Sequence, residues 1–264
     1  MTKRVFLSVA VAALLLAGAC GSSDTPEATS SPTGAGGQIT VLAAASLTEA
    51  FTQIANDFQT ANPGTKVNLS FGGSDALAAQ IDQGSPTDVF ASASPKWMDD
   101  VEQNGPGVTN RQDFAKNRLV VIVPADNPAG IQSINDLAND GVELVLAAED
   151  VPVGTYARQA LDNAGIADKA EANVVSNEDD VKAVVQKVAL GEADSGIVYQ
   201  TDVTDAVKDK VTAIPIADDV NVIATYPIAV IQNAPNASLA ASFEAYVLGP
   251  GQTVLQSFGF LPPT

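Results

Sequence analysis

The chain contains no histidine and only one cysteine. Without histidine, a Ser-His-Asp triad and a Cys-His pair are both excluded, and so are histidine metal sites. The lone cysteine, Cys20, cannot form a disulfide within the chain. The composition therefore argues against the common nucleophilic hydrolases and against histidine-dependent metalloenzymes.

Basic residues are also scarce. The 264 residues include 13 lysines and arginines against 31 aspartates and glutamates, which gives a formal net charge of -18. A chain this acidic is not expected to bind nucleic acid, because phosphates attract positive surfaces. To bind a small anion, it would have to use short-range dipoles rather than a broad positive field.

The first apolar run is too short to span a membrane comfortably. Two basic residues precede this run at 5–17, and small residues follow it. The pattern predicts a secretory signal peptide over residues 1–19. Cys20 comes directly after the small residues, which predicts a lipid-modified cysteine; a plain cysteine at a soluble N-terminus is the alternative. We expect an exported protein that is lipid-anchored on the outer face of the cell membrane.

Residues 20–37 comprise the anchor cysteine and a stretch rich in Gly, Ser, Thr and Pro, which predicts a flexible tether. From residue 38 onward, short apolar segments alternate with amphipathic ones, as in α/β proteins. Two long strands near the junctions between the parts indicate that the chain crosses twice between two lobes. The predicted parts are a first lobe of 38–120 plus 224–264 and an inserted second lobe of 121–223.

The alternation gives a specific set of expected elements. Proline at a first helical turn and glycine after a last turn mark several helix ends. The expected strands are 39–43, 66–71, 88–92, 118–123, 143–147, 195–199, 211–216 and 222–231. The expected helices are 47–61, 75–82, 95–103, 156–164, 179–190, 238–248 and 252–258.

Two serines stand where a strand is expected to end and a helix to begin. Ser46 follows three alanines, and Ser74 follows two glycines. A helix N-terminus offers free N–H groups and the positive end of the helix dipole, so a neutral hydroxyl beside it favours an anion site. Ordinary capping is the alternative, because Ser46 and Glu49 match a capping box and Ser74 suits an N-cap.

Three positions in the expected second lobe have related features. Val153 lies in a turn into a helix and Val181 near the start of another, so each would offer only a backbone N–H; apolar packing is the alternative. Tyr199 ends a strand, where ligands gather in open α/β sheets. A buried phenol with a structural hydrogen bond is the alternative for Tyr199.

Several short stretches match a known family in their order and spacing. They read AAASLT at 43–48, GSPTDVF at 84–90, KWMD at 96–99, NRLVV at 117–121, DVPVGTYA at 150–157, GEADSGIVY at 191–199, YPIAV at 226–230, GP at 249–250 and FGF at 258–260. Through them the chain resembles the extracytoplasmic molybdate-binding proteins of ABC importers. The resemblance implies an α/β, two-lobed type II periplasmic-binding-protein fold. In this fold the ligand cleft lies between lobes joined by two crossing strands.

By position, the resemblance implies that the ligand residues are Ser46, Ser74, Val153, Val181 and Tyr199. The serines would supply hydroxyl and backbone donors, the valines N–H groups, and Tyr199 its phenol. Molybdenum would be bound only as the oxyanion, so neither a direct metal ligand nor a cofactor is expected. The implied protein is a monomer and not an enzyme. It binds molybdate, together with tungstate, at high affinity for delivery to the permease subunits of an ABC importer.

A shell made only of donors would select its ligand by protonation state. Molybdate is fully ionised near neutral pH, whereas hydrogen phosphate would bring an unmatched O–H that costs about 1–3 kcal/mol. Sulfate differs only in size, and tungstate nearly matches molybdate. Asp75 stands where relatives commonly have a neutral small polar residue, and its carboxylate would repel a dianion if it turned inward.

Other readings remain open at this point. The same fold could bind another oxyanion such as sulfate or phosphate. An extracytoplasmic hydrolase using Ser46 or Ser74 would need a Ser–Lys arrangement, because histidine is absent and no Gly-x-Ser-x-Gly stretch occurs. A surface lipoprotein that binds other molecules without a small ligand is the third alternative.

Overall fold

The computed structural model describes residues 36–263 of the chain. The predicted signal peptide at 1–19, the predicted lipid site at Cys20 and most of the tether lie outside the described residues. Gly37, which we expected at the end of the tether, is the first residue of strand β1. In the described part, no helix combines the length and the apolar character needed to cross a membrane.

Helices and strands alternate along the described residues, and the structure is α/β as predicted. The strands are β1 (Gly37–Ala44), β2 (Thr65–Gly72), β3 (Val89–Ala91), β4 (Val108–Pro124), β5 (Leu144–Ala147), β6 (Val174–Glu178), β7 (Ser195–Tyr199), β8 (Val211–Pro215) and β9 (Ile223–Ile231). The α-helices are α1 (Thr48–Ala61), α2 (Ser74–Asp82), α3 (Pro95–Gln103), α4 (Pro152–Asn163), α5 (Ala167–Ala172), α6 (Val181–Ala189), α7 (Ala237–Leu248) and α8 (Gly251–Ser257). Short 3₁₀ turns are η1 (Ala45–Leu47), η2 (Ile134–Ala138) and η3 (Gln200–Asp202).

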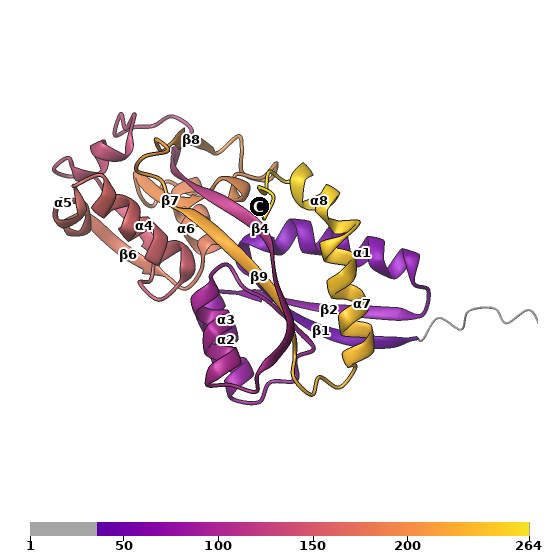
Figure 1. Ribbon diagram of the computed structural model, residues 1–264. Helices are drawn as coiled ribbons and strands as arrows, with labels where there is room; N and C mark the ends of the chain where they lie inside the picture. Colours follow the sequence, from indigo (N-terminus) through magenta and orange to yellow (C-terminus); the bar gives the residue numbers. More distant parts are fainter. Residues whose placement is uncertain (1–35, 264) are drawn as a thin grey trace, which may run out of the picture. The chain divides into compact units, whose positions relative to one another are not determined.

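One sheet runs through the described residues in the order β2-β1-β3-β9-β4-β7-β5-β6, and β8 also pairs with β4. Strand β4 is shared: it pairs with β9 as far as Arg118, and from Leu119 onward with β7 or β8. We call β1, β2, β3 and β9 with η1 and helices α1, α2, α3, α7 and α8 the first segment, and β5 to β8 with η3 and α4 to α6 the second segment, each with its connecting turns. Figure 1 shows β4 and β9 running between the two groups. The predicted lobe boundaries remain predictions; one falls within β4 and the other at the start of β9.

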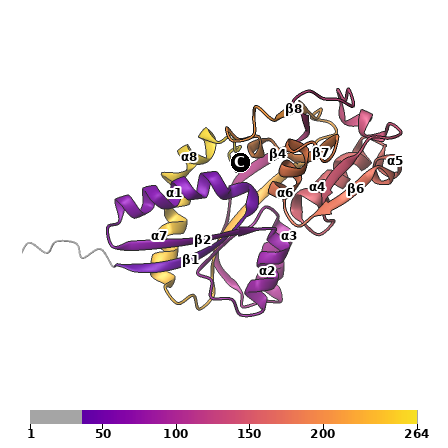
Figure 2. The ribbon, with the colours of Figure 1, turned by 180° about the vertical axis from the view of Figure 1, so that it is seen from behind.

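The first segment is covered by helices on both faces, which explains its nearly continuous apolar strands. β1 pairs in parallel with β2 and β3. Figures 1 and 2 show α1 on one side of β1 and β2, with α2 and α3 on the other side. Val41 packs in the cluster that contains Phe51 and Phe58 of α1, whereas its neighbour Leu42 packs with Met98 of α3. Successive residues of the strand point to opposite faces, and both faces are buried.

Several predicted boundaries were wrong, and two of the errors matter for the site. Helix α4 begins at Pro152 rather than at residue 156, because proline is tolerated at a first helical position, where its missing N–H has no intrahelical acceptor to lose. Helix α6 begins at Val181 rather than at residue 179, since Asp180 is its N-cap. Strand β4 begins at Val108, ten residues before the expected start, and its first part is irregular, with register shifts.

Two elements were not expected from the sequence. Helix α5 is only one and a half turns long, and β6 is a half-exposed strand at the edge of the sheet. Residues 177 and 178, which directly precede the helix expected at 179–190, form the end of β6. Short elements with little buried surface leave a weak apolar pattern in the sequence.

Candidate functional site

All five predicted ligand residues line one pocket between the two segments. Ser46 and Ser74 come from the first segment, and Val153, Val181 and Tyr199 from the second. The other lining residues are Ala44, Ala45, Gly72, Gly73, Ala93, Val151, Pro152 and Asp180. Within the pocket, about 10 Å³ is open to the centres of water-sized groups, which is close to what one water molecule needs. No lysine or arginine is among these lining residues, so the pocket has no formal positive charge of its own.

Three α-helices begin at this pocket. Their starts are Ser74 in α2, Pro152 in α4 and Val181 in α6. Val153 directly follows Pro152, so it lies in the first turn, where N–H groups lack intrahelical acceptors. Among the described residues, no hydrogen bond uses the N–H of Ser74, Val153 or Val181. The positive ends of three helix dipoles therefore meet around the pocket, which favours a negative ligand.

Asp180 is the one charged residue in the lining, and its carboxylate has a structural task. Its Oδ1 accepts the N–H of Ala183 at 3.0 Å and thereby caps α6. A cap of this kind satisfies one of the orphan donors of the helix and leaves the N–H of Val181 available.

Ser46 does not cap a helix, so the capping-box alternative for it is wrong. Ser46 lies inside the 3₁₀ turn η1 that precedes α1, and neither η1 nor α1 has a side-chain cap. The Oγ of Ser46 instead shares a hydrogen bond of 2.9 Å with the hydroxyl of Tyr226. Glu49, the expected partner in the box, turns toward Lys182. Because α1 begins only at Thr48, after η1, Ser46 is not at the N-cap position from which it could accept the first N–H groups of α1.

Asn117 orients the Ser46–Tyr226 pair. Its Nδ2 donates to Thr201 Oγ1 at 2.8 Å and to the Tyr226 hydroxyl oxygen at 3.4 Å. Both hydrogen bonds are satisfied when Tyr226 donates its own hydrogen to Ser46, and this leaves the Ser46 hydrogen free to point into the pocket. Our sequence reasoning gave Asn117 and Tyr226 no role. For Tyr226 the available signal was a hydroxyl within the mostly apolar strand β9, whereas Asn117 lies between two basic residues of β4 and gave no such signal.

Ser74 is the first residue of α2, and Gly73 is its N-cap, so the alternative that Ser74 is an N-cap is also wrong. Ser74 is 1% exposed, and its Oγ accepts the N–H of Ala93 at 3.0 Å. Because the oxygen is acting as an acceptor, its hydrogen is free to be donated. Ala93, 19 residues further along the chain, thus orients the Ser74 hydroxyl. We did not predict this contact.

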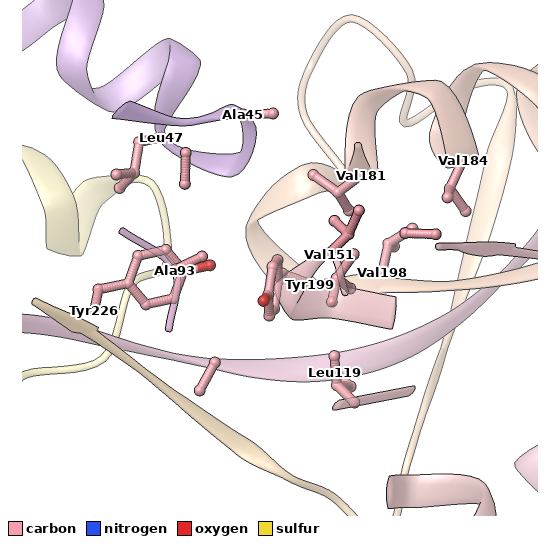
Figure 3. Close-up of a cluster of buried hydrophobic side chains, with 14 of the residues drawn as sticks. Ala45, Leu47, Ala93, Leu119, Val151, Val181, Val184, Val198, Tyr199 and Tyr226 are labelled. Carbon is pink, nitrogen blue, oxygen red and sulfur yellow. The ribbon is translucent and has the colours of Figure 1, made fainter. Parts of the chain in front are cut away.

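Tyr199 differs from both serines. It ends β7 as predicted, it is 1% exposed, and its hydroxyl has no hydrogen-bond partner among the described residues. Figure 3 shows it beside Tyr226, and the two ring centroids are 5.8 Å apart. Burial raises the pKa of Tyr199 well above its usual value, so the phenol stays neutral and remains a donor. A buried hydroxyl without a partner is rare, and at Tyr199 it leaves one hydrogen available for donation into the pocket.

Asp75 lies near the pocket but is not part of its lining. Its Oδ1 is buried and has no hydrogen-bond partner among the described residues. Burial first, and then the charges of Asp150 and Asp179, raise the pKa of Asp75 against the lowering effect of nearby N–H groups. A methyl group added at Gly73 would lie 2.5 Å from Asp75 Oδ1 and 2.7 Å from the carbonyl oxygen of Asp179. The two segments therefore approach each other very closely at Gly73.

Comparisons with known proteins find similar proteins over most of the chain. Residues 39–261 match the family described as bacterial extracellular solute-binding protein. The molybdate-binding protein ModA of Mycobacterium bovis is 40% identical over 256 residues, which is 96% of each chain. ModA of Escherichia coli is 36% identical over 232 residues, or 85% of this chain and 89% of its own. The structure of the periplasmic molybdate-binding protein of Azotobacter vinelandii has a TM-score of 0.75 at 23% identity, covering 86% of this chain and 100% of its own.

Proposed function

Because the chain belongs to the family of bacterial extracellular solute-binding proteins, we propose that it binds molybdate and delivers it to an ABC import permease. The two ModA relatives are molybdate-binding proteins by name, and they match most of this chain. The fold is that of the type II periplasmic binding proteins, as the resemblance implied. The proposed role is binding and transport, without catalysis.

The unpartnered hydroxyl of Tyr199 is the observation that carries the proposal. It lines the same pocket as three helix starts, and no cationic side chain is present there to make an ion pair with the ligand. A buried hydroxyl that lacks a partner costs about 1–3 kcal/mol, and an anion that accepts its hydrogen removes this penalty. We therefore assign Ser46, Ser74, Val153, Val181 and Tyr199 to the ligand shell.

The donor-only shell also favours molybdate over phosphate. Each serine oxygen of the pocket is already engaged: Ser74 Oγ accepts the N–H of Ala93, and Ser46 Oγ accepts from Tyr226 in the arrangement that also satisfies Asn117. These hydroxyls therefore present hydrogens, and hydrogen phosphate would find no acceptor for its own proton. Sulfate has no proton and is separated only by size, so it is the strongest competing ligand. Tungstate should bind nearly as well as molybdate.

The hydrolase alternative finds no support in the geometry of the pocket. A Ser–Lys mechanism needs a lysine within hydrogen-bond reach of the serine. No lysine lines the pocket, and each serine oxygen is bonded to another group, Tyr226 or the N–H of Ala93.

The remaining parts of the proposal concern assembly and location. The two segments would be the lobes 38–120 plus 224–264 and 121–223, which close around the anion. The protein would be a monomer that is attached to the outer face of the cell membrane through a lipid on Cys20. Mass spectrometry of the mature N-terminus tests the lipid, and loss of membrane attachment in Cys20→Ala would support it.

Calorimetric titration of the mature protein with molybdate, tungstate, sulfate and phosphate tests the function. We expect one molybdate or tungstate per chain and binding of sulfate and phosphate that is weaker by at least about tenfold. Tight phosphate binding would contradict a donor-only shell. No heat and no change in melting temperature with any of the four anions would favour the surface lipoprotein without a small ligand.

A further inference from the structure

Lys182 of α6 contacts two acidic residues, Glu49 on α1 and Asp202 in η3, and all three are close in sequence to residues that line the pocket. It directly follows Val181 at the start of α6, in the second segment. Its Nζ donates to both carboxylate oxygens of Glu49 on α1, at 3.1 and 2.9 Å. The same Nζ lies 3.2 Å from Oδ1 of Asp202, whose side chain is fully buried. One ammonium group therefore connects the first segment to the second.

Each acidic partner is close in sequence to a proposed ligand residue. Glu49 lies three residues after Ser46, on the helix that follows η1. Asp202 lies three residues after Tyr199, and its Oδ2 accepts the backbone N–H of Tyr199 at 3.3 Å. The position of Lys182 thus affects the backbone from which the unpartnered phenol extends.

Lys182 is not a ligand of the pocket. It is absent from the lining residues, and its single positive charge faces two carboxylates. Burial acts to lower the pKa of Lys182, but Asp202 and Glu49 outweigh it and raise the pKa, so the lysine stays charged. Burial raises the pKa of Asp202 to about 6 even with the lysine beside it, so Asp202 depends on this partner for its charge.

A second bridge between the segments provides a comparison. Lys96 of α3 lies 3.0 Å from Asp150, which precedes α4, but these side chains are 56% and 73% exposed. The corresponding values for Lys182, Glu49 and Asp202 are 23%, 36% and 0%. Exposed pairs contribute little because water screens them, whereas breaking a buried pair is costly.

We propose that Lys182 is a positioning residue that holds the closed pocket, by tying Glu49 on one segment to Asp202 behind Tyr199 on the other. This inference rests on the proposed function, since it concerns closure around the anion. A bridge made only in the closed form raises the equilibrium constant for closure. Because the ligand binds the closed form, its affinity rises by the same factor as that constant. The bridge should therefore slow release of the ligand more than it speeds association.

The test measures molybdate affinity and release rate in Lys182→Met, with two matched controls. Lys187→Met removes a lysine from the same helix that pairs with Glu178, at 3.5 Å, within the second segment. Lys96→Met removes the exposed bridge. We expect Lys182→Met to weaken binding by about 10–100-fold, mainly through faster release, and each control to change it by less than about fivefold.

A double-mutant cycle separates the bridge from general damage to the fold. Glu49→Gln should weaken binding by about 3–10-fold in the natural background and have almost no effect when Lys182 is already methionine. Glu49 is one-third exposed, so this variant should fold even if Lys182→Met does not. Additive effects of the two substitutions, or natural affinity and release in Lys182→Met or Glu49→Gln, would overturn the inference.

Small-angle scattering distinguishes failure of this inference from failure of the proposed function. If the unmodified protein binds none of the four anions, the proposed function fails. The radii of gyration of the ligand-free proteins then test whether Lys182 holds the two segments together. We expect a larger radius of gyration for Lys182→Met than for the unmodified protein and for Lys187→Met. Equal radii without ligand in that case would overturn the bridge, whereas saturating molybdate, when it binds, should close both proteins and give equal radii.

Discussion

The two walls of the pocket present their donors in different ways. The first wall carries the hydroxyls of Ser46 and Ser74, whose oxygens already accept hydrogens from Tyr226 and from the N–H of Ala93. The second wall offers the first-turn N–H groups of Val153 and Val181 and the hydroxyl of Tyr199, which has no partner among the described residues.

This difference indicates that the two walls contribute to ligand binding in different ways. On the first wall the protein itself fixes the direction of each donor, so the donors are oriented before a ligand arrives. On the second wall the donors stay unsatisfied until the ligand supplies acceptors, so the ligand gains most there. A change on the first wall should therefore affect the fit between the walls, whereas a change of Tyr199 should affect ligand release.

The largest expected effect comes from the backbone of the second wall. In Gly154→Ala, the new methyl would lie 2.0 Å from the carbonyl oxygen of Ala148 and 2.5 Å from that of Ala147. Backbone atoms cannot move aside cheaply, so we expect a loss of about 3 kcal/mol or more in the free energy of unfolding. Urea unfolding measures it, and a loss below about 1 kcal/mol would show that the start of α4 is less rigid than the structure indicates.

The next effect concerns the distance between the walls. Gly73→Ala brings no backbone strain, because its φ of -59° suits any residue, but its methyl would lie 2.5 Å from Asp75 Oδ1 and 2.7 Å from the carbonyl oxygen of Asp179 in the second segment. We expect molybdate binding to weaken by about 2–3 kcal/mol, because the Asp75 side chain can shift whereas the backbone oxygen of Asp179 holds the walls apart. Gly72→Ala is the control, since its nearest atom is a leucine methyl at 3.6 Å. Equal affinities of the two variants would refute close contact at Gly73.

Tyr199→Phe tests the unsatisfied donor directly. It removes a buried hydroxyl without a partner, so the ligand-free protein should be as stable as before or slightly more stable. Molybdate binding should weaken by about 1–2 kcal/mol, mostly through faster release in stopped-flow measurements. Tyr226→Phe should lower stability more than affinity. We expect the free energy of unfolding to fall by about 1 kcal/mol, because Ser46 loses its partner. If both variants bind like the unmodified protein, Tyr199 is not a ligand residue.

The smallest expected effect concerns Asp75, which borders both walls. Burial, Asp150 and Asp179 raise its pKa above 3.8, so its contribution to stability is fully present below that value and is lost as the pH rises through the raised pKa. Asp75→Asn should therefore gain stability relative to the unmodified protein as the pH increases from about 4 to about 8, as followed by urea unfolding. It should also bind molybdate about twofold to fivefold more tightly near neutral pH. A stability difference that does not change with pH would mean that the carboxylate is not strained.

The sequence alone determined the class of fold and singled out the residues of the candidate site. Its apolar periodicity predicted most of the strands and the helix at 47–61, because burial on a sheet leaves a regular pattern. The five residues that it singled out line one pocket. Small residues after strand ends pointed to Ser46 and Ser74, and the family resemblance named the full set of five.

Only the tertiary structure decided how these residues are held. Ser46 looked like a helix cap by spacing, yet its partner is Tyr226, 180 residues away. Glu49 completed a capping box in the sequence but crosses to Lys182 on the other segment. A local pattern records which bonds a residue is able to make. Which of them forms depends on what the fold brings within about 3 Å, and no short stretch of sequence contains that information.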